Sequence, residues 1–165
     1  MFVTLLEKEL MHYINKILFI LVIFSVVSCN NSSGDSKEAA ERLTSLNNWV
    51  ISEIYANDAP VFKNGKLVEQ FGAPGFERYM ENVRLTKDGL FTGYFKGETK
   101  PMTLKWQINA KNITVFSADP AAAKGGEWTI DPKDVYKDSF SMKTQSTAYN
   151  YPQMTRVELK FKKGD

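Results

Sequence analysis

The feature that most constrains the fold is a repeated alternation of short apolar runs and turns, which begins at Trp49 and continues almost to the C-terminus. Each run is rich in β-branched and aromatic residues, and most are separated by only a few residues. Short connections favour antiparallel neighbours. The pattern predicts an all-β antiparallel domain of about seven or eight strands, either an up-and-down barrel or a sandwich. The expected strands are Trp49–Ala56, Tyr79–Thr86, Leu90–Lys96, Met102–Ile108, Ile113–Ser117, Glu127–Asp131, Val135–Lys143 and Thr155–Lys162.

Local details predict how these strands turn and which side each one buries. Asp88-Gly89 lies between two strand-like runs, which is a strong signal for a tight hairpin. In the last run, apolar residues such as Val157 and Phe161 alternate with charged ones. One face of that strand is therefore expected to be buried, and the other, which carries Arg156, to face water.

The N-terminal segment has the features of a secretory leader. Ile17–Val27 is apolar except for Ser25, and Lys16 comes directly before it. A helix that crosses a bilayer needs about 20 apolar residues. This shorter run, next to a positive charge, is instead typical of a signal peptide. Met11 is the better start, because the acidic residues Glu7 and Glu9 oppose a basic leader.

The apolar run ends in Val26-Val27-Ser28-Cys29, which resembles the lipobox of bacterial lipoproteins. The resemblance implies a diacylglyceryl group on the Cys29 thiol, cleavage before Cys29, and an acyl chain such as palmitate on the freed amine. Several acyl chains together give stable anchoring in a membrane. We therefore expect residues 1–28 to be a lipoprotein signal peptide and the protein to be anchored in the cell envelope. The expected membrane is the outer membrane, with its periplasmic or surface face left open.

The mature chain lacks the residue types that most enzyme sites need. Removing residues 1–28 from the 165-residue chain leaves 137 residues that contain no histidine, because His12 is the only one, and no cysteine besides Cys29. This excludes Ser-His-Asp and Cys-His nucleophilic sites and ordinary zinc centres. A net charge of only +2 argues against a nucleic-acid partner. We therefore expect a non-enzyme without catalytic residues, metal or cofactor.

Between the leader and the strands, the sequence predicts a tether and a short helix. Residues 30–37 read NNSSGDSK, a polar stretch with nothing to bury. A modest apolar stripe over Lys37–Leu46 predicts a helix, capped by Asp35 or Ser36, that packs across one end of the fold or serves as a plug or lid. The expected division is residues 29–42 for the lipidated tether and helix start, and 43–165 for the β domain.

Three stretches resemble small lipocalin-like lipoproteins of Bacteroidota. Leu46-Asn47-Asn48-Trp49 is similar to the L-x-G-x-W opening of lipocalin-like proteins. A hairpin at Lys87-Asp88-Gly89 follows, and Leu104–Phe116 then reads as strand, turn and strand. The resemblance covers roughly 43–162 and implies an up-and-down barrel whose interior holds a small hydrophobic ligand. The chain departs from the pattern at Asn47, where glycine is usual. In the family pattern, an arginine of the last strand packs on the tryptophan of the first strand. Arg156 is the only candidate for this arginine, but the alternation places it on the outer face.

Aromatic residues are the candidate ligand-binding residues. Trp49, Trp106 and Trp128 lie on three predicted strands, where they either line a cavity or pack in a core. Tyr149 and Tyr151 lie in the last long loop, either as exposed binding anchors or folded over a barrel mouth.

Other segments carry weaker candidates. Residues 71–76 form either a mobile lid or an ordered closure of one barrel end. Asp131 and Asp134 flank a turn and are either calcium ligands or solvated turn residues. The dense acidic spacing of a calcium-binding loop is missing, which favours the solvated turn.

The expected function is that of a lipid-anchored envelope protein that binds a small hydrophobic or amphipathic ligand. The alternative is a non-catalytic structural or interaction lipoprotein that serves as an accessory subunit of an envelope complex. A third possibility, a hydrolase with two carboxylates, has no motif in its support.

Overall fold

The computed structural model describes residues 31–68, 78–119, 126–150 and 152–164. These belong to one compact unit that spans Asn31–Asp165. Cys29, Tyr151 and residues 71–76, which the sequence singled out, lie outside the described residues.

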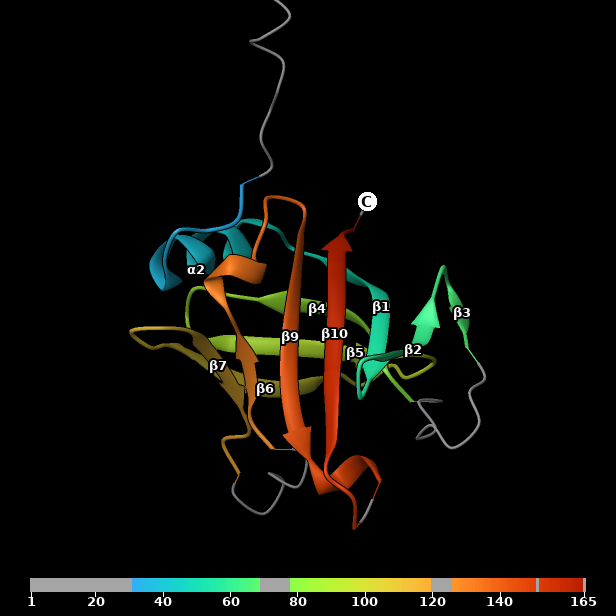
Figure 1. Ribbon diagram of the computed structural model, residues 1–165. Helices are drawn as coiled ribbons and strands as arrows, with labels where there is room; N and C mark the ends of the chain where they lie inside the picture. The colour runs from blue at the N-terminus through green and yellow to red at the C-terminus, as the bar shows by residue number, and fades with distance from the viewer. Residues whose placement is uncertain (1–30, 69–77, 120–125, 151, 165) are drawn as a thin grey trace, which may run out of the picture. The chain divides into compact units, whose positions relative to one another are not determined.

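Eight antiparallel strands close into an up-and-down barrel, which decides between the two architectures that the sequence left open (Figure 1). Each strand pairs with the next along the chain, and the last strand pairs with the first over seven residue pairs from Trp49↔Lys163 to Ala56↔Val157. The barrel strands are β1 (Trp49–Ala56), β4 (Met80–Leu85), β5 (Leu90–Phe95), β6 (Met102–Ile108), β7 (Ile113–Phe116), β8 (Trp128–Ile130), β9 (Ser139–Ser146) and β10 (Thr155–Lys163).

A side hairpin that the strand pattern did not predict branches from the barrel wall. It consists of β2 (Ala59–Lys63) and β3 (Lys66–Leu67), joined by a turn in which Asn64 and Gly65 both have positive φ. β1 pairs with β4 through its first residues and with β2 through its last ones, so the hairpin stands beside the barrel (Figure 1). Pro60 weakened the strand signal, since proline donates no backbone hydrogen bond. The Asn64-Gly65 pair was the signal that could have revealed the hairpin.

The predicted strand at Val135–Lys143 is displaced in the structure. Pro132–Asp134 forms a short 3-10 helix, η2, and Val135 makes only an isolated bridge with Phe140 before β9 begins at Ser139. Asp134 forms an ion pair with Lys143, with Oδ2 and Nζ 2.7 Å apart. Across the described residues, no group of three or more acidic, histidine or cysteine side chains is arranged to hold a metal ion.

One end of the barrel is covered by α2 (Ser36–Ser45), at the top of Figure 1. The Asp35 carboxylate accepts hydrogen bonds from the backbone N–H groups of Lys37 and Glu38, so it is the helix cap. Ala39, Ala40 and Leu43 face the barrel and are buried. In the described part of the chain, no helix is long and apolar enough to cross a bilayer.

More of the polar N-terminal segment is ordered against the barrel than its composition indicated. Ser33 is buried, and both its backbone N–H and its hydroxyl donate hydrogen bonds to the carbonyl oxygen of Val135. The chain is therefore fixed to the barrel several residues before α2 begins.

Aromatic side chains fill the barrel beneath α2. Trp49 and Phe161 are fully buried, and Phe140 lies between them. The Phe140 ring meets Trp49 edge-on at 5.1 Å between centroids and stacks on Phe161 at 4.9 Å. Rings packed in this way leave no room for a ligand among them, so access to the barrel interior has to come from the other end.

Candidate functional site

The barrel end opposite α2 is packed less completely than the helix-covered end. Phe95 at the end of β5, and Met102 and Leu104 at the start of β6, lie on the inward-facing side of their strands, yet each remains half-buried. Inward-facing residues near α2, such as Ile113 and Ile130, are fully buried. Half-buried apolar side chains on an interior face are suited to contact with an apolar ligand.

Of the three candidate tryptophans, Trp128 lies at this end of the barrel, whereas Trp106 lies toward the other end, beside the hairpin between β4 and β5. Trp106 pairs with Val115, and Val115 pairs with Trp128, so the three side chains lie in one cross-strand row on the inner face. Trp106 is half-buried, and its Nε1–H donates to the carbonyl oxygen of Thr86 at 3.0 Å. Trp49 lies among the rings beneath α2 instead, so the three do not form one site.

Tyr149 folds back over the barrel end rather than standing out from it. It belongs to the 3-10 helix η3 (Thr147–Tyr149), in the connection between β9 and β10 at the bottom of Figure 1. Its ring meets Trp128 in a T-shaped arrangement at 6.4 Å and packs against the core. Burial raises the pKa of the Tyr149 hydroxyl to about 12, so the group is neutral at physiological pH.

A buried hydroxyl without a partner lies at the same end. Thr155 begins β10, is fully buried and alternates with the inward-facing Val157 and Leu159. Among the described residues, its Oγ1 makes no hydrogen bond. A buried hydroxyl left in this state is costly, so this atom is a candidate partner for a polar group of a ligand.

Cationic side chains border this end of the barrel. The Arg78 guanidinium lies over the Phe95 ring at 3.7 Å from its centroid and pairs with Glu98, with Nε and Oε1 2.7 Å apart. The Lys96 ammonium lies over the Tyr79 ring at 5.6 Å. An apolar interior with a charged border matches a ligand that has an apolar body and a polar head.

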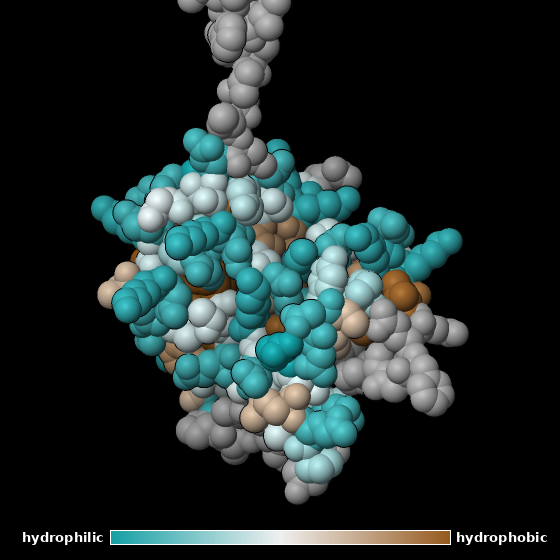
Figure 2. All heavy atoms as spheres, viewed as in Figure 1, coloured by the Kyte–Doolittle hydropathy of each residue, from teal (hydrophilic) through white to brown (hydrophobic). Residues whose placement is uncertain are grey.

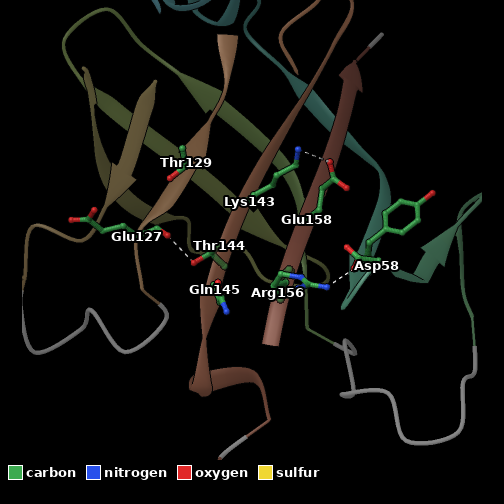
Figure 3. A pocket seen from close by; sticks show the side chains of 10 residues that line it. Asp58, Glu127, Thr129, Lys143, Thr144, Gln145, Arg156 and Glu158 are labelled. Atoms are coloured by element: carbon green, nitrogen blue, oxygen red, sulfur yellow. Dashed lines mark hydrogen bonds and ion pairs between the residues drawn. The ribbon is translucent and has the colours of Figure 1, made fainter. Parts of the chain in front are cut away.

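A second candidate is a groove on the outside of the barrel, across β8, β9, β10 and β1 (Figure 3). It has a volume of about 330 Å³. The side chains of Lys143, Glu158 and Arg156 stand along it, and Asp58 lies at its edge. The surrounding face over β9 and β10 is largely hydrophilic (Figure 2).

The charges of this outer groove are engaged with one another. Arg156 pairs with Asp58, and Lys143 contacts both Glu158 at 3.5 Å and Asp134 at 2.7 Å. The hydrogen bond to Asp134 is the main reason that the pKa of Lys143 is raised. A charged ligand would have to break these pairs, so the groove is a weaker candidate than the barrel end.

The structure also places the Arg156 side chain on the outer face of the barrel, as the alternation in the last strand predicted.

Several residues of the barrel end were missed by sequence reasoning. Phe95 and Met102 read as ordinary strand residues, and Thr155 was only the start of the last strand. Arg78 comes just before a strand and carried no motif. The strand alternation could have placed Phe95 and Met102 inside, but no sequence signal separates a half-buried interior position from a filled one.

No family model and no curated protein matches the sequence. Among solved structures, the chain is similar to the bovine lipocalin allergen Bos d 2, with 15% identity over 76% of this chain and 75% of that one and a TM-score of 0.43. It is also similar to a deswapped triple mutant of bovine odorant-binding protein, with 16% identity, 70% and 71% coverage and a TM-score of 0.40. The closed, up-and-down order of the strands itself shows the barrel fold.

Proposed function

We propose that the protein is a non-catalytic, lipid-anchored envelope protein that binds a small amphipathic ligand in the barrel end opposite α2. The observation that carries the binding role is the set of half-buried, inward-facing side chains Phe95, Met102 and Leu104. The neutral Tyr149 hydroxyl and the Thr155 hydroxyl, which makes no hydrogen bond to a described residue, offer polar contacts beside them. Lys96 suits a ligand with an anionic head, and Arg78 could join it only by exchanging its ion pair with Glu98 for the ligand.

Fluorescence titration with cis-parinaric acid tests the binding role, because this fatty acid has an apolar tail and a carboxylate. We expect saturable binding of one probe per protein, and a loss of at least about tenfold in affinity for Met102→Trp, which fills the space beside Phe95. Leu67→Ala removes an exposed apolar side chain on the side hairpin and is the matched control. A probe that binds Met102→Trp as well as wild type would contradict this site.

The anionic head is tested separately with the methyl ester of the same fatty acid. If Arg78 and Lys96 contact the carboxylate, the ester binds more weakly than the acid, and the difference shrinks as salt rises. Equal binding of the acid and the ester would show that Arg78 and Lys96 do not contact the ligand, while the apolar part of the site would still stand.

Anchoring is supported by the apolar run that ends at Cys29. Metabolic labelling with radioactive palmitate checks it in cells that express the full chain. Wild type is expected to carry label and to fractionate with membranes, whereas Cys29→Ser carries none. Label on Cys29→Ser, or an unlabelled wild type, would refute the lipid anchor.

A role as an accessory subunit remains the second candidate, and exposed apolar residues favour it. Leu67 and Val68 are exposed at the side hairpin, on the right in Figure 2, and Met154 is exposed near η3. Crosslinking in cells from cysteines placed at Leu67 and Met154 tests this role. A partner captured from either position, together with no binding of parinaric acid, would favour it over the ligand-binding role.

A further inference from the structure

A polar pocket lies on the outer wall of the barrel, where the chain enters β1 beside β4 and β5. Its volume is about 420 Å³, within the usual range for small-molecule sites. None of the residues assigned above to the barrel-end site lines it. The polar and aromatic residues among its lining are Asn47, Asn48, Asn82, Arg84, Thr86, Asp88, Thr92 and Tyr94.

The outward face of β5 provides a row of contacts along this pocket. Leu90, Thr92 and Tyr94 alternate with the inward-facing Phe91 and Gly93. Leu90 is 38% exposed and Tyr94 is 42% exposed, so an aliphatic and an aromatic surface flank a hydroxyl. The four residue steps from Leu90 to Tyr94 span roughly 13 Å, which is about the length of two or three pyranose rings.

Three amide side chains around this row make no hydrogen bond to any described residue. Asn82 pairs across the sheet with Tyr94, and Asn47 and Asn48 lie on the exposed entry to β1. Among the described residues, no hydrogen bond involves the side-chain amides of these three asparagines. Each amide offers donors and an acceptor together, which is the combination that paired hydroxyl groups require.

The two charges in the pocket have opposite signs. Arg84 faces outward from β4, and Asp88 lies in the following hairpin. A hydrogen bond from the Thr86 hydroxyl is the main cause of the lowered pKa of Asp88, so this carboxylate is ionised at neutral pH. The pocket therefore has no net charge and favours neither a strongly anionic nor a strongly cationic ligand.

We propose that this pocket is a binding site for neutral carbohydrate. Tyr94 stacks against the apolar face of one sugar ring, Leu90 contacts a second, and the amides of Asn82, Asn47 and Asn48 bind hydroxyl groups between them. The site is separate from the barrel end, so each can be occupied or removed without the other.

Isothermal titration of the full-length protein with neutral oligosaccharides tests the proposal. The protein is held in a detergent without a sugar head, and the probes are maltohexaose, cellohexaose, xylohexaose and mannohexaose. At least one is expected to bind. Tyr94→Ala then weakens binding by about tenfold or more, Asn82→Ala by about fivefold, and Tyr94→Phe by little because the ring is retained. Thermal unfolding establishes that each variant is folded.

Gln107→Ala is the matched control, because Gln107 is an exposed amide on β6 that does not line the pocket. It should bind as wild type does. If none of the four oligosaccharides binds, or if folded Tyr94→Ala and Asn82→Ala bind like wild type, the proposal is overturned. Oligogalacturonate is titrated as the anionic comparison. Binding restricted to it and lost in high salt would also overturn the proposal, since that pattern indicates an anionic ligand.

Discussion

The indole Nε1–H of Trp49 donates a hydrogen bond to the carbonyl oxygen of Leu43, with 3.0 Å between the two atoms. This bond joins α2 to the first residue of β1, and both side chains are fully buried. The helix is thus fixed as a permanent cover of one barrel end. A ligand bound in the interior, as proposed, would have to enter at the other end, where the interior side chains Phe95, Met102 and Leu104 are half-buried.

Trp49→Phe should lower the free energy of unfolding by about 2–4 kcal/mol, because it removes buried ring volume and leaves the Leu43 carbonyl oxygen without its donor. Trp106→Phe is the matched comparison, since the Trp106 indole also donates to a carbonyl but is half-buried. Its expected loss is smaller, about 1 kcal/mol. Urea denaturation followed by circular dichroism measures both losses. Equal losses would contradict the expectation that the fully buried Trp49 contributes more to stability than the half-buried Trp106.

Tyr149 should ionise later than the other tyrosines in an alkaline titration followed by the absorbance of tyrosinate. Burial raises its pKa from 10.0 to about 12. Below pH 10 the hydroxyl is protonated in both states, so the folded protein keeps its full stability. Above that pH the unfolded chain loses the proton first, and stability falls until the folded pKa is passed, by about 1–2 kcal/mol after allowance for solvent exposure. Tyr149→Phe should lack both the late ionisation and this loss.

Most strands could be predicted because runs of β-branched and aromatic residues are separated by turns, and because inward-facing and outward-facing positions alternate in strands such as β6 and β10. β1 and β6 have the predicted bounds, since Trp49–Ala56 and Met102–Ile108 are long and clearly patterned. The side hairpin was missed because β2 contains Pro60, which donates no backbone hydrogen bond, and because β3 has only two residues. The shift of β9 arises because Val135 packs in the core from outside any strand.

The candidate site could be predicted only in part, since Phe95 was missed although it is aromatic. Trp128 and Tyr149 stood out by size, and the structure brings their rings together. Whether an inward-facing side chain is fully buried depends on contacts across the barrel, as the difference between Ile113 and Met102 shows. Such contacts join residues far apart in sequence, so no local pattern encodes them.

Gly93→Ala should destabilise the barrel by about 1–2 kcal/mol, because a Cβ at this position would lie 2.6 Å from the Sδ atom of Met80. Both residues face the interior near the barrel end opposite α2. Shortening the neighbour in Met80→Ala should remove part of that cost, so the double variant should be more stable than the sum of the single changes indicates. If the losses in the free energy of unfolding of the two single variants simply add in the double variant, Met80 moves away from the new Cβ at position 93 without cost.

Removing the Arg156–Asp58 ion pair should change stability by less than about 0.5 kcal/mol, because both side chains are largely exposed and solvent screens the pair. Arg156→Ala and Asp58→Ala are compared with the double variant in a thermodynamic cycle. A coupling energy above about 1 kcal/mol would show that this pair holds the barrel seam between β10 and the turn after β1.

Thr155→Val separates a ligand-binding role of this position from a structural one. The two side chains have nearly the same shape, and the Thr155 hydroxyl is buried without a partner among the described residues. Replacing it with a methyl group should therefore leave stability unchanged or raise it by up to about 1 kcal/mol. If the hydroxyl binds the polar part of an amphipathic ligand, the same variant should bind cis-parinaric acid about fivefold more weakly. Greater stability with unchanged affinity would mean that the hydroxyl has no part in binding.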